Sequence, residues 1–222
     1  MKNAEREHKR CPFHAILVKD IPDRSHLNKA VFKGSNLKHD ITEWNHETMV
    51  TVERKAKDMA KAVSPMLSNC TEAIFIDPHF DPEKDKYRVT IKAFLQEIVN
   101  HRCTFSPKRI EVHASDRDDK PSFDEFSRRC NDNNLRSCIP KGMTVCFKRW
   151  KEKQNGEHEK LHNRFILTNI GGVAFLFGLD EGDGSDIVVL LTRKVYEQIW
   201  EQYAESNPAF DLDDSVEIEG TA

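Results

Sequence analysis

His162 and Arg164 carry side chains that suit phosphate chemistry. We predict that they begin a β-strand, in which residues two apart project from the same face. An imidazole can attack phosphorus or transfer a proton near neutral pH. A guanidinium stays charged and offers a planar fork that matches phosphate oxygens. The spacing therefore predicts a phosphate-directed pair, with His162 as the nucleophile or acid and Arg164 as the clamp on the phosphoryl group.

A second pattern overlaps the first at His162. The segment from His158 to His162 reads H-E-x-x-H, which in zinc proteases places two metal-binding histidines one helical turn apart. That chemistry requires a helix. The Asn-Gly pair at 155–156 and the strand-like sequence NRFILT that follows favour a junction between a loop and a strand. We therefore predict no metal site, and a zinc metalloprotease stays as an alternative function.

Three more candidate residues fall at the ends of predicted strands. Asp77 and His79 end the strand predicted over 73–80, and His113 lies near the end of the strand predicted over 109–115. Ligands of open α/β sheets gather beyond the carboxyl ends of parallel strands. If the two strands are neighbours, these side chains can reach one rim and bind substrate. The structural alternatives are a turn or helix-cap carboxylate for Asp77 and partly buried edge positions for the histidines.

A basic and aromatic stretch precedes the His162 segment. Lys148 and Arg149 stand beside Trp150, a combination that suits contact with a nucleic-acid backbone together with base stacking. A charged solvent-exposed face is the alternative interpretation. Farther along, the acidic, Gly-rich loop at 180–186 has the wrong spacing for an EF-hand calcium site, so we expect a solvated turn there.

The segment LHNRFILTNIGGVAFLFGLD (161–180) resembles the HxK…D…G(S) segment of phospholipase D-like proteins. The strand AIFIDPHF (73–80) resembles the Asp-Pro-aromatic strand end of divergent members of that superfamily. The likeness covers residues 48–206. In the family, the motif lies on a hairpin of the central sheet, so the resemblance implies a phospholipase D-like domain with its site on such a hairpin.

The resemblance also implies a mechanism. In the family, one histidine attacks phosphorus, a second histidine from another motif copy protonates the leaving oxygen, and neither a metal nor a cofactor is required. Because this chain has one copy of the motif, a complete site would require a homodimer. The implied activity is that of a metal-independent nuclease or of a nucleic-acid-binding component of a bacterial defence-type system. Such a component would act within a larger protein assembly.

Three positions depart from the family pattern. Arg164 replaces the motif lysine, Asn169 stands where the family has aspartate, and Asp180 follows a Gly-Leu pair where the family has Gly-Ser. A catalytically degenerate module that binds a partner or a phosphate ligand is therefore the alternative function. The residues predicted to bind phosphate or substrate are His79, His113, Asn169, Lys148, Arg149, Asp77 and Asp180.

Hydrophobic spacing predicts the elements that position these residues. Helices are predicted over 49–64, 89–101, 122–133 and 193–206, and strands over 73–80, 109–115, 143–150, 162–169, 173–180 and 186–191. The alternation indicates an α/β domain over 48–206, with a mixed, mostly parallel sheet covered by helices on both faces. Strands at 14–20, 30–34 and 41–44 predict a β-rich appendage over 1–47, and 207–222 is predicted to be an acidic tail.

Composition limits the remaining choices. The net charge of −3 does not indicate the strongly basic character of many nucleic-acid-binding domains, although a local basic patch remains compatible with it. No apolar run approaches the roughly 20 residues of a transmembrane helix, so no membrane anchor is expected. The six cysteines include no CxxC pair, which favours reduced thiols and a cytoplasmic protein.

Overall fold

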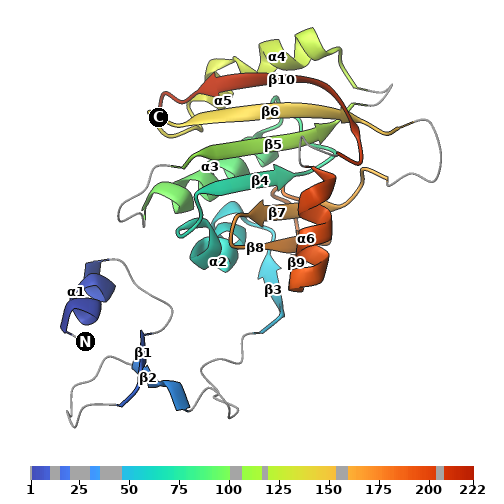
Figure 1. Cartoon of the computed structure of the whole chain (residues 1–222). Coiled ribbons are helices and arrows are strands. Elements are labelled where there is room, and N and C mark those ends of the chain that lie inside the picture. Colours follow the sequence, from blue (N-terminus) through green and yellow to red (C-terminus); the bar gives the residue numbers. More distant parts are fainter. Residues whose placement is uncertain are drawn as a thin grey trace. The chain divides into compact units, whose positions relative to one another are not determined.

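The computed structural model of the chain describes residues 2–10, 16–20, 31–35, 47–100, 107–116, 120–153, 160–203 and 208–222. The chain divides into two compact units. The smaller unit contains helix α1 (Lys2–Arg10) and a parallel pair of strands, β1 (Ile16–Val18) and β2 (Val31–Lys33) (Figure 1). The predicted β-strands at 14–20 and 30–34 are thus present, whereas the polar N-terminus forms a helix. The strand predicted over 41–44 lies outside the described residues.

The larger unit, Thr48–Asn100 with Phe105–Ala222, contains every candidate site residue. Its eight-stranded sheet has the order β10-β6-β5-β4-β7-β8-β9-β3. The strands are β3 (Met49–Glu53), β4 (Glu72–Ile76), β5 (Arg109–Ser115), β6 (Thr144–Lys151), β7 (Arg164–Thr168), β8 (Gly171–Phe175), β9 (Ser185–Leu190) and β10 (Asp211–Glu219). The helices are α2 (Ala56–Leu67), α3 (Asp85–Asn100), α4 (Phe123–Cys130), α5 (Asn133–Arg136) and α6 (Arg193–Gln202).

The sheet is mixed, as predicted, but it is mostly antiparallel rather than mostly parallel. Only β4, β5 and β6 run parallel, because α3 and then α4 with α5 connect them as crossovers. The hairpin of β7 and β8 turns at Asn169 and Ile170, and such a short connection can join only antiparallel strands. Strands β3 and β10 then add antiparallel edges to the sheet.

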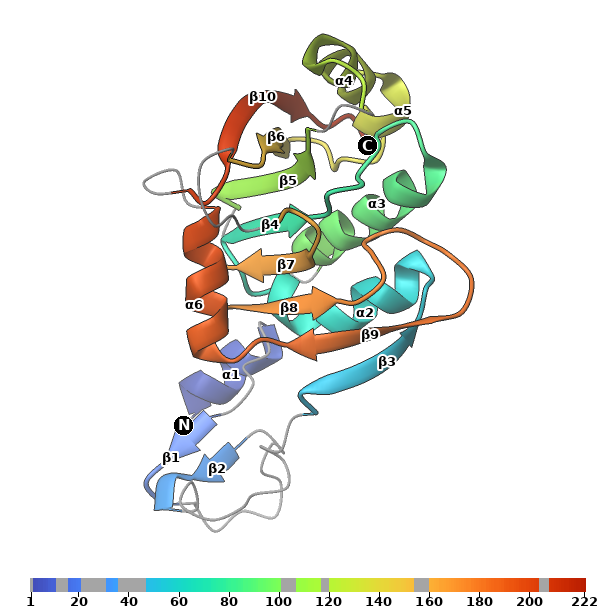
Figure 2. The ribbon, with the colours of Figure 1, turned by 90° about the vertical axis from the view of Figure 1, so that its right-hand side faces the viewer.

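Helices cover both faces of this sheet, with α2 and α3 on one side and α6 on the other (Figure 2). Two hydrophobic clusters separate accordingly. The larger cluster holds Phe75, Phe94 and Phe147 between the sheet and α2–α5. The smaller one holds Ile76, Trp150 and Tyr203, with partly buried residues of α6 packed against it. The alternation of strand side chains therefore decides which face each candidate residue reaches.

Several predicted boundaries are wrong, and those at the two ends of α2 differ for clear reasons. The helix predicted over 49–64 is preceded by β3, whose residues Met49–Glu53 pair with β9, and α2 starts only at Ala56. Pro65 does not end α2 either, because Leu67 is fully buried and the backbone N–H of Ser68 donates to the Ser64 carbonyl. None of the described helices has the length and apolar character needed to cross a membrane.

The predicted acidic tail also differs from the structure. Residues Asp211–Glu219 form β10, which pairs with β6 along its length. Most side chains of β10 are exposed, so the acidic groups are solvated although the backbone belongs to the sheet. The hydrophobic contact that fixes this edge comes from Ile218, which is buried in the larger cluster.

Candidate functional site

Most candidate residues lie at one edge of the sheet, which we call the carboxyl edge. The parallel strands β4, β5 and β6 end there, β7 begins there because it is antiparallel to β4, and β8 returns to it. This edge is the place where open α/β sheets bind ligands. The candidate residues near it are Asp77, His79, His113, Lys148, Arg149, His162, Arg164 and Asp180.

His162 lies in an exposed turn just before β7 rather than in the strand itself. Its Nδ1 is 3.2 Å from the carbonyl oxygen of Lys160. If Nδ1 carries the proton and donates it to that carbonyl, Nε2 keeps its lone pair for a ligand or a substrate. The imidazole is therefore open to solvent at the carboxyl edge.

Arg164 is the first residue of β7 and is partly buried. The antiparallel register pairs Ile76 of β4 with Phe165 of β7. Asp77 follows Ile76 and Arg164 precedes Phe165, so these two residues lie opposite each other at the carboxyl edge. The charge of Arg164 acts on Asp77, but no described carboxylate forms a direct ion pair with the guanidinium. The Nε of Arg164 is buried and has no hydrogen-bond partner. A buried donor without a partner costs free energy, and an anion bound there would remove that cost.

Asp77 is almost completely buried at the end of β4. Its carboxylate accepts hydrogen bonds from the backbone N–H groups of His79 and Leu179, each at 2.8 Å. Burial raises the pKa of Asp77, while these two hydrogen bonds and the charge of Arg164 oppose that rise. Asp77 therefore fixes the turn after β4 and joins it to the segment after β8, which agrees with the turn interpretation of this residue.

Asp180 is a second buried carboxylate at this edge. It accepts a hydrogen bond from Arg54 at 2.9 Å and one from Lys86 at 2.7 Å. Asp77 and Asp180 thus carry two negative charges, and Arg54, Lys86 and Arg164 carry three positive ones. Asp180 engages two of these cations, and Arg164 is the cation that acts on Asp77. The five residues together have one more positive charge than negative charges, so this end of the sheet can attract an anion.

Asp186 holds the segment 176–178 after β8, a structural role that the sequence pattern did not predict. Asp186 is fully buried, and its carboxylate accepts the backbone N–H groups of Leu176 at 3.0 Å, Phe177 at 3.1 Å and Gly178 at 3.4 Å. Gly178 is required here, because a Cβ would collide with the Asp180 carboxylate. Sequence spacing predicts a solvated acidic turn, and only the tertiary structure shows that Asp186 points inward.

The side chains of His113 and Lys148 lie on the face of the sheet that α6 covers, where they form a buried polar network with Glu111. The carboxylate of Glu111 lies 2.8 Å from Nε2 of His113 and 3.1 Å from Nζ of Lys148. Burial lowers the pKa of His113, whose ring lies 5.4 Å from those of Trp150 and Tyr203. His113 and Lys148 are nearly inaccessible to solvent, so a substrate cannot reach them without rearrangement.

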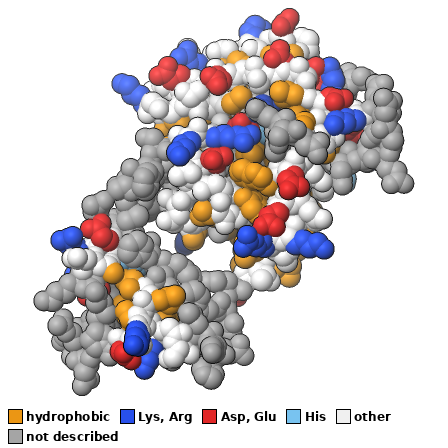
Figure 3. All heavy atoms as spheres, viewed as in Figure 1, with side chains coloured by type: hydrophobic (Ala, Val, Ile, Leu, Met, Phe, Trp, Pro, Cys, Tyr) orange, Lys and Arg blue, Asp and Glu red, His pale blue; other side chains and the backbone are white. Residues whose placement is uncertain are grey.

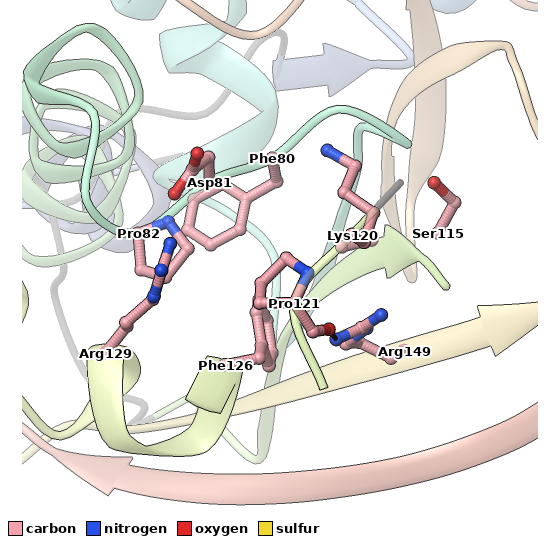
Figure 4. Close-up of a pocket in the computed structure, with 10 residues that line it drawn as sticks. Phe80, Asp81, Pro82, Ser115, Lys120, Pro121, Phe126, Arg129 and Arg149 are labelled. Atoms are coloured by element: carbon pink, nitrogen blue, oxygen red, sulfur yellow. Dashed lines mark hydrogen bonds between the residues drawn. The ribbon is translucent and has the colours of Figure 1, made fainter. Parts of the chain in front are cut away.

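Arg149 follows Lys148 but points to the other face. Its guanidinium forms an ion pair with Asp116, donates to the carbonyl of Pro121 at 2.5 Å, and lies over the ring of Phe126. Figure 4 shows it at a pocket beyond the ends of β4 and β5. That pocket has a volume of only about 20 Å³, close to the space needed for one water molecule. Arg149 is therefore held by Asp116, Pro121 and Phe126, although its Nε is buried without a hydrogen-bond partner.

The two remaining candidates have different surroundings. The backbone N–H of His79 is bound by Asp77, and its side chain is partly buried at the carboxyl edge. Asn169 lies in the turn after β7, at the opposite end of that strand from Arg164. Its Oδ1 accepts the backbone N–H groups of Thr71 and Glu72 at 2.7 and 3.1 Å. Asn169 therefore joins the hairpin to the start of β4 and is not brought near His162.

The H-E-x-x-H alternative is only partly within the structure. His158 and Glu159 lie outside the described residues, whereas Leu161 and His162 form a turn that leads into β7. A zinc-protease motif requires its second histidine on a helix, and the described part of the motif is not helical. Among the residues with described positions, no group of three or more His, Cys, Asp or Glu side chains could hold a metal ion.

Comparisons with known proteins give little beyond this geometry. No protein-family model matches the chain, and no curated protein matches it. Among solved structures, TrmBL2, described as an archaeal chromatin protein with a novel mode of DNA binding, is similar with a TM-score of 0.35 and 10% sequence identity. The match covers 78% of this chain and 56% of that one. A similarity of this size carries no functional conclusion.

Proposed function

We propose that the chain binds nucleic-acid phosphodiesters at its carboxyl edge, with Arg164 as the phosphate clamp and His162 beside it. The observation that carries this proposal is the partly buried guanidinium of Arg164, which has an unpartnered Nε and no direct ion pair with a described carboxylate. An arginine in that state suits a phosphate oxygen, which accepts charge-assisted hydrogen bonds. The resemblance of the 161–180 segment to phospholipase D-like proteins supports the same assignment.

The surroundings of Arg164 favour binding over rapid turnover. The carboxylate of Asp180 accepts hydrogen bonds from Arg54 and Lys86, and the side chain of Asn169 accepts them from the backbone at the other end of β7. Neither is free to complete a catalytic site around His162. The face that carries α6 shows basic and acidic side chains interspersed with hydrophobic ones, so it is not a continuous basic surface (Figure 3).

Replacing Arg164 with alanine tests the proposal. We expect Arg164→Ala to weaken binding of a fluorescein-labelled oligonucleotide by roughly ten- to hundredfold, because one charge-assisted contact is worth about 1.5–3 kcal/mol. The salt dependence of the association constant should also decrease by about one phosphate contact. Fluorescence anisotropy titrations at several salt concentrations measure both effects.

The matched control for this experiment is Arg193→Ala. Arg193 is highly exposed, begins α6 and, among the residues that the structure describes, forms an ion pair only with Glu197 of the same helix. Its replacement removes the same charge from the chain without touching the carboxyl edge. Equal losses of affinity in the two variants would show that only net charge matters, and full affinity in Arg164→Ala would refute the phosphate clamp.

Metal-independent cleavage is the second candidate function, and the exposure of the His162 imidazole favours it. The second histidine would come from another copy of the chain in a homodimer. We expect wild-type protein to cleave DNA or RNA in the presence of EDTA and His162→Ala to lose that cleavage. A gel-based nuclease assay with and without EDTA decides this. If the protein binds nucleic acid but does not cleave it, only the binding function remains. A role in a bacterial defence-type assembly would then depend on non-catalytic recognition.

A further inference from the structure

Two large hydrophobic side chains stand exposed at the carboxyl edge. Leu176 and Phe177 follow β8 directly and are 53% and 59% exposed. Phe175, immediately before them, is almost completely buried in the larger hydrophobic cluster. The chain therefore passes from the core to the surface within two residues and places an aromatic ring in solvent.

The backbone beneath these side chains is unusually well fixed. Asp186 accepts the N–H groups of Leu176, Phe177 and Gly178, and Asp77 accepts that of Leu179. Both carboxylates are buried, so water competes weakly for these hydrogen bonds. A ligand that contacts Phe177 would order little additional backbone, which lowers the entropic cost of binding. The backbone that carries the exposed ring of Phe177 is thus already ordered before a ligand binds.

The strand register links Phe177 to the phosphate site. Arg164 pairs with Phe175, and Phe177 comes two residues later, at most roughly 7 Å farther along the chain. On the neighbouring strand, His162 comes two residues before Arg164. A cation for the phosphate and an exposed aromatic ring for the base are the two elements with which proteins hold single-stranded nucleic acid. A duplex keeps its bases stacked inside and offers no free base face to such a ring.

We propose that Phe177 stacks against an unpaired base of a single-stranded nucleic acid whose neighbouring phosphate is bound by Arg164. The inference rests on the proposed function and specifies its substrate class as single-stranded. It assigns a role to Phe177, which lies within the 161–180 segment but is not among the residues predicted to bind phosphate or substrate. It also gives the buried carboxylates Asp77 and Asp186 an indirect part in recognition, because they hold the backbone that carries the ring.

The test compares three labelled ligands in fluorescence anisotropy titrations: a thymidine oligonucleotide, an abasic strand of the same length, and a duplex. We expect Phe177→Ala to weaken binding of the thymidine strand at least about fivefold, since loss of stacking on one base has an effect of this size. Binding of the abasic strand should be unchanged. Phe177→Trp should keep or improve the affinity for the thymidine strand, and wild-type protein should bind that strand more tightly than the duplex.

The matched control is Ile170→Ala. Ile170 is 54% exposed in the turn at the other end of β7, so its loss removes comparable apolar surface away from the site. An equal effect of Phe177→Ala on the thymidine and abasic strands, or no effect on either, would overturn base stacking. The two proposals fail separately: if Arg164→Ala weakens all ligands while Phe177→Ala weakens none, only base stacking is lost. If wild-type protein binds none of the three ligands, the proposed function itself is refuted.

Discussion

Glu111→Ala is expected to lower the free energy of unfolding by about 3–5 kcal/mol, the usual cost of removing one partner from a buried ion pair. The substitution leaves the ammonium group of Lys148 buried without its carboxylate and removes the partner of His113 Nε2. Arg109 loses the same carboxylate but is partly exposed, so water can compensate it. Urea denaturation followed by circular dichroism measures the change.

Two further variants separate charge burial from general damage to the sheet. Glu217→Ala removes an exposed carboxylate from β10 and should change stability by less than about 0.5 kcal/mol. The double replacement Glu111→Leu with Lys148→Met removes both charges together and should recover much of the lost stability, since apolar groups can replace a buried ion pair at little cost. A double variant that is less stable than Glu111→Ala would contradict this explanation.

The same network makes stability depend on pH. Burial alone would raise the pKa of Glu111, but hydrogen bonds from His113 and Arg109 and the charge of Lys148 hold it well below its usual range. The contribution of Glu111 is therefore present above its ordinary pKa of about 4.3 and is lost as the pH falls below that value. The pKa of His113 is lowered by burial, so the unfolded state takes up a proton first and stability also falls below about pH 6.5.

Asp186→Ala is expected to destabilise the chain by about 3 kcal/mol, because its carboxylate is the acceptor for three consecutive backbone N–H groups. These donors belong to Leu176, Phe177 and Gly178, and Asp186 itself is fully buried. The N–H of Leu176 also donates to the Ile187 carbonyl at 3.3 Å, whereas no second acceptor is described for the N–H groups of Phe177 and Gly178, apart from Asp186. The segment after β8 should also become sensitive to limited proteolysis, which mass spectrometry of the fragments would locate.

Asp183→Ala provides the control for this prediction. Asp183 lies in the same acidic segment but is exposed, so its replacement should change stability by less than about 0.5 kcal/mol. Asp186→Asn should fall between the two, since the amide keeps one acceptor oxygen. Asp186→Ala protein with wild-type stability and unchanged proteolysis at 176–179 would show that the carboxylate does not hold the segment.

Local patterns in the sequence predicted the elements around the site well. The strand at 109–115 matches β5 residue for residue, and the side chain of Ser122 accepts a hydrogen bond from the Glu125 N–H at the start of α4, as its capping pattern predicts. A hairpin is present within the predicted 162–180 segment, although its strands β7 and β8 span only Arg164–Thr168 and Gly171–Phe175. These features depend on neighbouring residues and on hydrophobic periods of a few residues, so the sequence contains the information directly.

Long-range pairing decided what the local patterns left open. β3 and β10 are strands because they pair with β9 and β6, partners far away in the sequence, and these pairings also made the sheet mostly antiparallel. Buried carboxylates were equally hidden, since an inward-pointing Asp186 and a solvated aspartate have the same sequence pattern. Their role depends on which backbone N–H groups the folded chain brings to them.

The pair His162 and Arg164 shows both contributions. The sequence by itself determined their types, their spacing and the position of Arg164 at the start of a hairpin strand, whereas His162 lies in the turn before that strand. Only the tertiary structure decided that Arg164 lies beside Asp77 with an unpartnered Nε, because β4 pairs with β7. It also separated Lys148 from Arg149, since successive residues of a strand face opposite sides of the sheet, and it placed Asn169 at the far end of β7. Residue types define the possible chemistry, but strand pairing determines which side chains meet.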